Sequence, residues 1–407
     1  MIGIFMNQCI LCKAELTLDE KPEHILLDAL GGRATTKEVI CSACNNEMGS
    51  GPDKDLAESV ASLRTIANLK SGSRKKAPSL SVSPDNGEAY ELHPTGNTTP
   101  KIQNALDLGQ DEDGNPTLSI SARDEQHLEN LLEAATRAIA LPPEKHDVFK
   151  DMVRKDAVVK STPAAAFSSQ LALGSKKSLE AMAKACLVLW AKLIGNSEVC
   201  DTRYDEIRDF IRKSKQPTNE AKNFGTDTRP FSGSSSRFGE NANIVWVGSN
   251  EQGAARGYFR LYGAVGWTFC LCEKSEFRNR SIVLISDPLD QSRWVCGEEH
   301  GHLLNYEWVG ERPNYDDIDW EEPKRKFGLI MAHGHEQMLE TAFDTIVRQS
   351  FDDFGIEEGA SVPPDMIEKF SSRLAYKFAH LVTKQPYEEP YATKPRNGSQ
   401  GASDDET

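Results

Sequence analysis

Residues 9–12 read Cys-Ile-Leu-Cys and residues 41–44 read Cys-Ser-Ala-Cys, and these two short stretches decide how the beginning of the chain folds. Each pair presents two sulfur atoms from one tight turn, and two such pairs complete the tetrahedral set of four thiolates that zinc prefers. Four cysteine ligands leave no open coordination position for water, so this zinc would stabilise the fold and the chemistry would lie elsewhere. The predicted zinc ligands are Cys9, Cys12, Cys41 and Cys44.

A Glu23-His24 pair lies between the two cysteine pairs, and Asn45 directly follows the last cysteine. With these residues the segment resembles the HNH endonucleases, specifically the treble-clef, ββα-metal type with the layout CxxC…(D/E)H…CxxCN. The resemblance covers about the first 60 residues. It implies a zinc-stabilised module in which two short strands precede a helix.

The resemblance also implies a reaction, the hydrolysis of phosphodiester bonds in nucleic acid, with DNA as the expected substrate. In the family the matching histidine is the general base, so His24 would take a proton from the attacking water, a task that suits an imidazole near neutral pH. Glu23 and Asn45 match the ligands of one catalytic divalent ion, Mg²⁺ or Mn²⁺, which would stabilise the developing negative charge. Asn46 could support Asn45 or replace it as a ligand of the divalent ion, and Asp53 is the nearest alternative carboxylate ligand.

Two other functions stay open at this point. The module could bind nucleic acid through its zinc frame without cutting it, or it could be a scaffold for protein interactions, which the acidic remainder of the chain would suit. The intact Glu23-His24 pair favours a nuclease over both. Three further groups have metal-like residue types, at 298–302, at 333–336 and at Cys270 with Cys272, but polar turns and buried structural cysteines are the commoner explanations.

The distribution of charge restricts where nucleic acid could bind. The chain of 407 residues has a formal net charge of −15, whereas its first 76 residues carry ten basic and ten acidic groups and are neutral. A polyanion would therefore bind locally and in a salt-sensitive way. Arg74, Lys75 and Lys76 form a compact basic cluster, which is either a solvated segment or an arm that contacts phosphates.

Composition predicts a globular protein without a membrane segment, because no apolar run approaches the length needed to cross a bilayer. The start of the chain has no basic region or cleavage site typical of a secretory signal. Four of the nine cysteines stand in pairs with metal spacing, which fits a reducing compartment. We expect a cytoplasmic protein whose partner is nucleic acid; its oligomeric state is not predicted.

The expected fold class is α+β, with the nuclease module followed by a larger mixed α/β domain. Apolar positions at helical spacing predict a helix over 178–194, and further helices are expected at 53–69, 335–348 and 366–382. The predicted divisions are an HNH nuclease domain (1–70), a basic linker (71–78), an α+β domain of unknown role (79–384) that contains a long loop (223–240), and a disordered acidic tail (385–407).

Overall fold

The computed structural model describes residues 7–383 apart from 74–76, 84–88, 95–97, 103–104, 111–112, 115, 124, 159–169, 216–223, 232–234, 312–317 and 358. Contacts divide the chain into two compact units, one that ends at Gly334 and one that begins at His335. The predicted mixture of helix and sheet is confirmed. The basic cluster at 74–76 and the predicted tail at 385–407 lie outside the described residues.

The first unit begins with two short strands and three short helices. Strand β1 pairs antiparallel with β2, and Glu23 lies opposite Thr36. The helix predicted over 53–69 is divided in two, because the backbone at Val60 leaves the helical region. The elements are β1 (Glu23–His24), the 3₁₀ helix η1 (Asp28–Leu30), β2 (Thr35–Thr36), α1 (Ser42–Ser50), α2 (Pro52–Ser59) and α3 (Ala61–Ile66).

Two glycines make the tight return between β1 and β2. Gly31 has a φ angle of 84°, in the left-handed region that side chains other than glycine rarely adopt. A Cβ atom on Gly32 would lie only 1.8 Å from the backbone oxygen of Leu26. The chain can therefore turn back here only because both residues lack a side chain.

A six-stranded antiparallel sheet forms the centre of the first unit. Its strand order is β13-β12-β9-β10-β11-β8, and the middle strands are buried along nearly their whole length. The strands are β8 (Phe224–Asp227), β9 (Asn243–Ser249), β10 (Ala255–Leu261), β11 (Val265–Cys272), β12 (Ser281–Ser286) and β13 (Trp294–Gly297).

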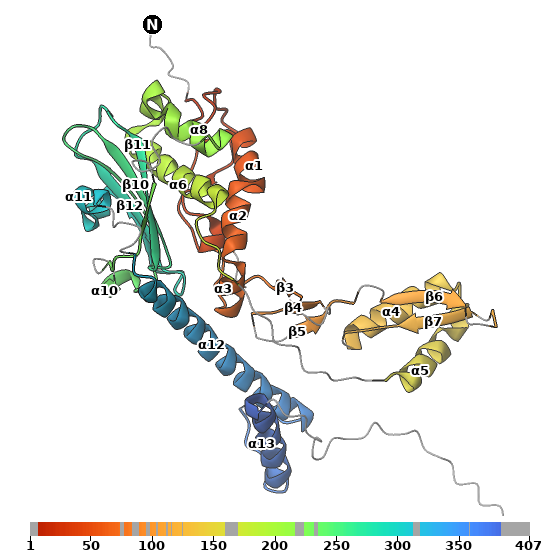
Figure 1. Ribbon diagram of the computed structural model, residues 1–407. Helices are drawn as coiled ribbons and strands as arrows, with labels where there is room; N and C mark the ends of the chain where they lie inside the picture. Colours follow the sequence, from red (N-terminus) through yellow and green to blue (C-terminus); the bar gives the residue numbers. More distant parts are fainter. Residues whose placement is uncertain are drawn as a thin grey trace, which may run out of the picture. The chain divides into compact units, whose positions relative to one another are not determined.

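Helix α6 (Lys176–Ile194) lies between this sheet and the N-terminal helices, with α7 (Asn196–Val199) and α8 (Asp205–Lys213) following it (Figure 1). It packs on α2 on one side and on the central strands of the sheet on the other. One continuous hydrophobic core accordingly includes side chains from the cysteine-rich segment, from α6 and from the sheet. The helix predicted over 178–194 is thus present and almost entirely buried.

A second, smaller core lies on the other face of the sheet. It is built around Trp246 and Tyr258 and is covered by short helices. The remaining elements of the first unit are β3 (Leu80–Val82), β4 (Tyr90–Leu92), β5 (Thr98–Pro100), β6 (Leu106–Gln110), β7 (Pro116–Ile120), α4 (Glu125–Ala138), η2 (Pro143–Lys145), α5 (His146–Asp156), η3 (Thr202–Tyr204), α10 (Ser235–Phe238), η4 (Glu298–Leu303) and α11 (Tyr306–Gly310).

One expectation about secondary structure is wrong. The segment 223–240 is not one long loop, because β8 adds an edge strand to the sheet beside β11 and α10 follows it. The helix expected at 335–348 is present, as part of a longer helix, α12 (Glu321–Asp353). Within the second unit α12 packs against α13 (Ile367–Thr383), for example through the rings of Phe351 and Phe370, whose centroids are 5.1 Å apart.

The Gly31-Gly32 turn generates a stability prediction. Gly32→Ala should lower the free energy of unfolding by about 3 kcal/mol, because the added methyl group collides with backbone rather than with a movable side chain. Gly49→Ala is the control, since a Cβ there meets nothing within 4 Å and the residue lies inside a helix. Urea denaturation of both variants checks this; equal stability would contradict the proposed reason for the turn.

Candidate functional site

The four cysteines predicted to bind zinc lie together. Their sulfur atoms are all within 4.8 Å of one another, and Cys9 and Cys44 are buried. The hydrogen bond between Cys9 and Cys44 lowers the pKa of Cys9 and raises that of Cys44, so the two sulfur atoms are close enough to share one proton. Among the described residues, no other group of three or more His, Cys, Asp or Glu side chains is arranged to hold a metal ion. The donor set fits one structural zinc.

Residues far along the chain hold the two cysteine turns in place. The backbone N–H of Ile10 donates to the oxygen of Val39 at 3.0 Å and thereby joins one turn to the other. The Asn196 side-chain amide donates to the oxygens of Gln8 (2.8 Å) and Glu38 (2.6 Å), one beside each turn. The zinc frame is therefore supported from α7 as well as by its own ligands.

A cavity of about 400 Å³ lies beside this frame. Four residues named in the sequence analysis contribute to it, whereas Asn46 is exposed and does not line it. Tertiary structure thus brings a histidine, two carboxylates and an amide from three different elements to one cavity. Its lining residues are Pro22, Glu23, His24, Leu27, Asp28, Ala29, Asn45, Gly49, Asp53, Lys54 and Ala57.

Residues 9–60 match the sequence model of a family described as HNH endonuclease. The match covers 52 of the chain's 407 residues, and we refer to this HNH-like segment as the HNH domain. The matched segment contains the four cysteines and the side chains of Glu23, His24, Asn45 and Asp53 that line the cavity. A search of curated proteins and a search of solved structures each found no significant match.

A charged side chain from outside the matched segment pairs with two carboxylates of the cavity. Lys184 of α6 is only 1% exposed, and its Nζ lies 2.6 Å from Glu23 Oε1 and 2.6 Å from Asp53 Oδ2. Burial acts to lower the pKa of Lys184, but the carboxylates of Asp53 and Glu23 outweigh that effect and raise it. Lys184 is therefore a buried ammonium shared by two carboxylates.

Sequence reasoning missed Lys184. Its only signal is a lysine within the apolar stretch from Ala181 to Ile194, where the helical pattern predicts core positions. Lysine is almost never fully buried unless it is paired. Such a lysine indicates a buried acidic partner, although the sequence does not say which of the chain's 62 acidic residues that partner is.

Glu23 and His24 are neighbours on β1 but have different surroundings. Successive side chains of a strand point to opposite faces, and Glu23 is 5% exposed while His24 is half-buried at the cavity. Burial raises the pKa of Glu23, and the Lys184 ammonium opposes that rise. In the described part of the chain no side chain hydrogen-bonds the His24 ring, which lines the cavity.

The oxygen atoms at the cavity fit a divalent ion, with one restriction. Lys184 engages one oxygen of Glu23 and one of Asp53, which leaves the second oxygen of each carboxylate. Asp53 Oδ1 is buried and has no hydrogen-bond partner among the described residues, as expected for an atom that awaits a ligand or a water. With the Asn45 amide, these oxygens would suit Mg²⁺ or Mn²⁺. The predicted ligands Glu23 and Asn45 and the alternative carboxylate Asp53 all line this cavity.

A second contact ties α6 to the HNH domain. The hydroxyl groups of Ser175 and Ser178, at the N-terminus of α6, donate to Asp55 Oδ2 at 2.5 and 2.8 Å. Helix α2 thus presents Asp53 and Asp55 to α6, one to an ammonium and one to two hydroxyls. The position of Lys184 relative to the cavity is fixed at two points.

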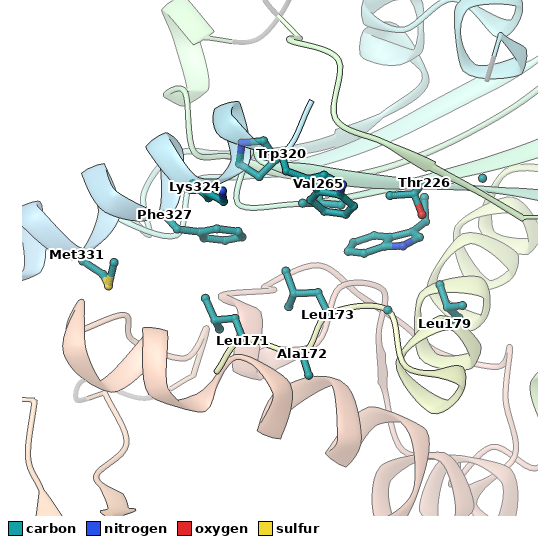
Figure 2. A pocket seen from close by; sticks show the side chains of 14 residues that line it. Leu171, Ala172, Leu173, Leu179, Thr226, Val265, Trp320, Lys324, Phe327 and Met331 are labelled. Atoms are coloured by element: carbon teal, nitrogen blue, oxygen red, sulfur yellow. The ribbon is translucent and has the colours of Figure 1, made fainter. Parts of the chain in front are cut away.

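A separate cavity of about 810 Å³ lies in the larger part of the first unit. Figure 2 shows its mainly apolar lining, which shares no residue with the cavity beside the cysteines. Its one lysine, Lys324, is paired with Glu321 at 2.6 Å. The lining residues are Leu171, Ala172, Leu173, Gly174, Leu179, Gly225, Thr226, Val265, Trp267, Trp320, Pro323, Lys324, Phe327 and Met331.

No described helix combines the length and hydropathy of a membrane span.

The cysteine cluster predicts a metal content and a response to its loss. Elemental analysis of protein purified without added metal should find about one zinc per chain, and Cys12→Ser should reduce it to near zero and lower the melting temperature. Cys270→Ser, which alters a partly buried cysteine outside the cluster, should keep the zinc. Folded wild-type protein without zinc would contradict the assignment.

Proposed function

We propose that the HNH domain hydrolyses phosphodiester bonds of nucleic acid, with DNA as its substrate. The observation that carries the proposal is the cavity in which His24 lies with Glu23, Asn45 and Asp53, inside the matched segment and beside the cysteine cluster. A histidine at an open cavity, next to oxygen ligands for a divalent ion, is the arrangement that water activation at a phosphodiester requires.

His24 would be the general base. Its neutral imidazole accepts a proton from water as that water attacks phosphorus, and the bond to the leaving 3′-oxygen then breaks. Asn45 and the free oxygens of Glu23 and Asp53 would hold the divalent ion. When bound, Mg²⁺ or Mn²⁺ supplies positive charge for the phosphate and the leaving oxygen. The zinc of the four cysteines takes no part in the reaction and holds the two sides of the domain in register.

The basic cluster Arg74, Lys75 and Lys76 is the proposed phosphate-contacting arm. Its preceding residue, Ser73, donates its backbone N–H to Asp28 Oδ1 at 2.7 Å, and Asp28 lines the cavity. Ser73, the last described residue before the cluster, therefore lies close to the proposed site of cleavage. The acidic remainder of the chain supports local binding of this kind over a broad contact.

A zinc-dependent binding module that does not cut, or a protein-interaction scaffold, is the second candidate function. A function of this kind gives no reason for a histidine and two carboxylates to share one cavity, and we therefore rank it below the nuclease.

Two further predictions concern the whole protein. The chain beyond residue 78 supplies substrate choice, a partner surface or control of the nuclease, and the protein is cytoplasmic.

His24→Ala tests the reaction. The rate of plasmid nicking with Mg²⁺ or Mn²⁺ should fall about 100- to 10,000-fold because the general base is lost. Zinc content and melting temperature should stay close to those of the wild type, since the ring has no described hydrogen-bond partner. His302→Ala, at an exposed histidine away from the cavity, should cut normally. Cutting by His24→Ala at the wild-type rate would refute the mechanism, and binding without cutting by the wild type would favour the second candidate.

Alanine at Arg74, Lys75 and Lys76 tests the phosphate arm. Each lost phosphate contact lowers the slope of log binding constant against log salt by about one, so the slope should fall by up to about three. DNA binding measured from low to moderate salt gives this slope. A control with the same loss of charge, but at exposed positions outside the HNH domain, should keep the wild-type slope; its substituted residues are Lys145, Lys155 and Lys192.

A further inference from the structure

The space between Glu23 and Asp53 already contains a cation. The Lys184 ammonium lies 2.6 Å from one oxygen of each carboxylate and is shielded from water. These are hydrogen-bond distances for a charged pair, and they leave no room for a metal ion between the same two oxygen atoms. A divalent ion that used both of these oxygens would have to displace the ammonium.

Lys184 also changes the net charge that a metal ion would meet. Glu23, Asp53 and Lys184 together carry −1, whereas the two carboxylates alone would carry −2. In the part of the chain that the structure describes, Lys184 is the only basic side chain that pairs with either carboxylate. The nearby Lys54 pairs with Glu58 instead. One buried side chain therefore decides how strongly these acids attract a cation.

We propose that Lys184 is a built-in competitor of the divalent ion: its ammonium holds Glu23 and Asp53 and thereby weakens the binding of Mg²⁺ or Mn²⁺ to the HNH site. The proposal rests on the proposed function, because it concerns the same two carboxylates, of which Lys184 holds one oxygen each and the divalent ion would use the other. It assigns a residue outside the matched segment the task of setting metal affinity. Lys184 acts through the two carboxylates and is not itself a catalytic residue.

The competition predicts a gain in metal affinity when the ammonium is removed. The dissociation constant for Mn²⁺, measured by electron paramagnetic resonance on zinc-loaded protein without nucleic acid, should fall at least about tenfold in Lys184→Met. Lys184→Arg keeps the charge and should bind Mn²⁺ about as weakly as the wild type. Adding Asp53→Asn to Lys184→Met should abolish the gain. Unchanged or weaker Mn²⁺ binding by Lys184→Met would overturn the proposal and would make Lys184 a scaffold for the ligands.

A second pair of variants covers the case in which Lys184→Met does not fold, since that change leaves two buried carboxylates without a partner. Glu23→Gln keeps Lys184 on Asp53, while Glu23→Gln with Lys184→Met frees Asp53 and restores the wild-type local charge of −1. Competition predicts tighter Mn²⁺ binding by the double variant than by Glu23→Gln alone. Equal or weaker binding by the double variant would overturn the proposal.

The failure of this proposal and the failure of the proposed function give different results. Mn²⁺ binding is measured without nucleic acid, so it does not depend on whether the protein cuts. His24→Ala should stop cutting, while adding Lys184→Met to it should still tighten Mn²⁺ binding by the same factor. A nuclease whose Mn²⁺ affinity does not respond to Lys184→Met would refute only the role of Lys184, and a response without any cutting would refute only the reaction.

Discussion

The burial of helix α6 is the constraint on which the arrangement of the first unit depends. The helix lies between the HNH domain and the six-stranded sheet, so its middle is shut off from water and Lys184 there is only 1% exposed. An unpaired buried ammonium would cost several kcal/mol, and Lys184 avoids this cost only by meeting Glu23 and Asp53. Three segments that are distant in sequence are thus required to meet at one point, and that point borders the cavity with His24.

The HNH domain shares its hydrophobic core with α6 and the six-stranded sheet. In addition, Asn196 and Arg208 hydrogen-bond to backbone oxygens of its zinc turns. The region beyond the matched segment therefore does more than follow the nuclease domain along the chain. It fixes the zinc turns and supplies a charge to the candidate site.

The proposed reaction would divide its tasks among different kinds of group. The cysteine cluster would hold the backbone, and its closed set of four ligands would leave the zinc no position open to a substrate. His24 is half-buried, whereas its neighbour Glu23 is almost fully buried and paired with Lys184, and both line the cavity. The period of two in strand β1 thus gives these adjacent residues different surroundings.

The sequence by itself determined the features that depend on local spacing. Two CxxC pairs specify a metal cluster, and Glu23-His24 between them with Asn45 behind them indicates the family. The helix over 178–194 follows from the regular spacing of its apolar residues. Each CxxC pair lies within one turn and the apolar pattern within one helix, where residue type and separation fix the geometry.

Only the tertiary structure decided which distant groups meet. The partners of Lys184 lie more than 100 residues away, and no pattern in the chain names them. Strand β8 forms within a Gly/Ser-rich segment because β11 offers it an edge to pair with, which local composition does not reveal. Hydrogen bonding between strands and the pairing of buried charges are set by packing across the whole unit, so they appear only once the chain has folded.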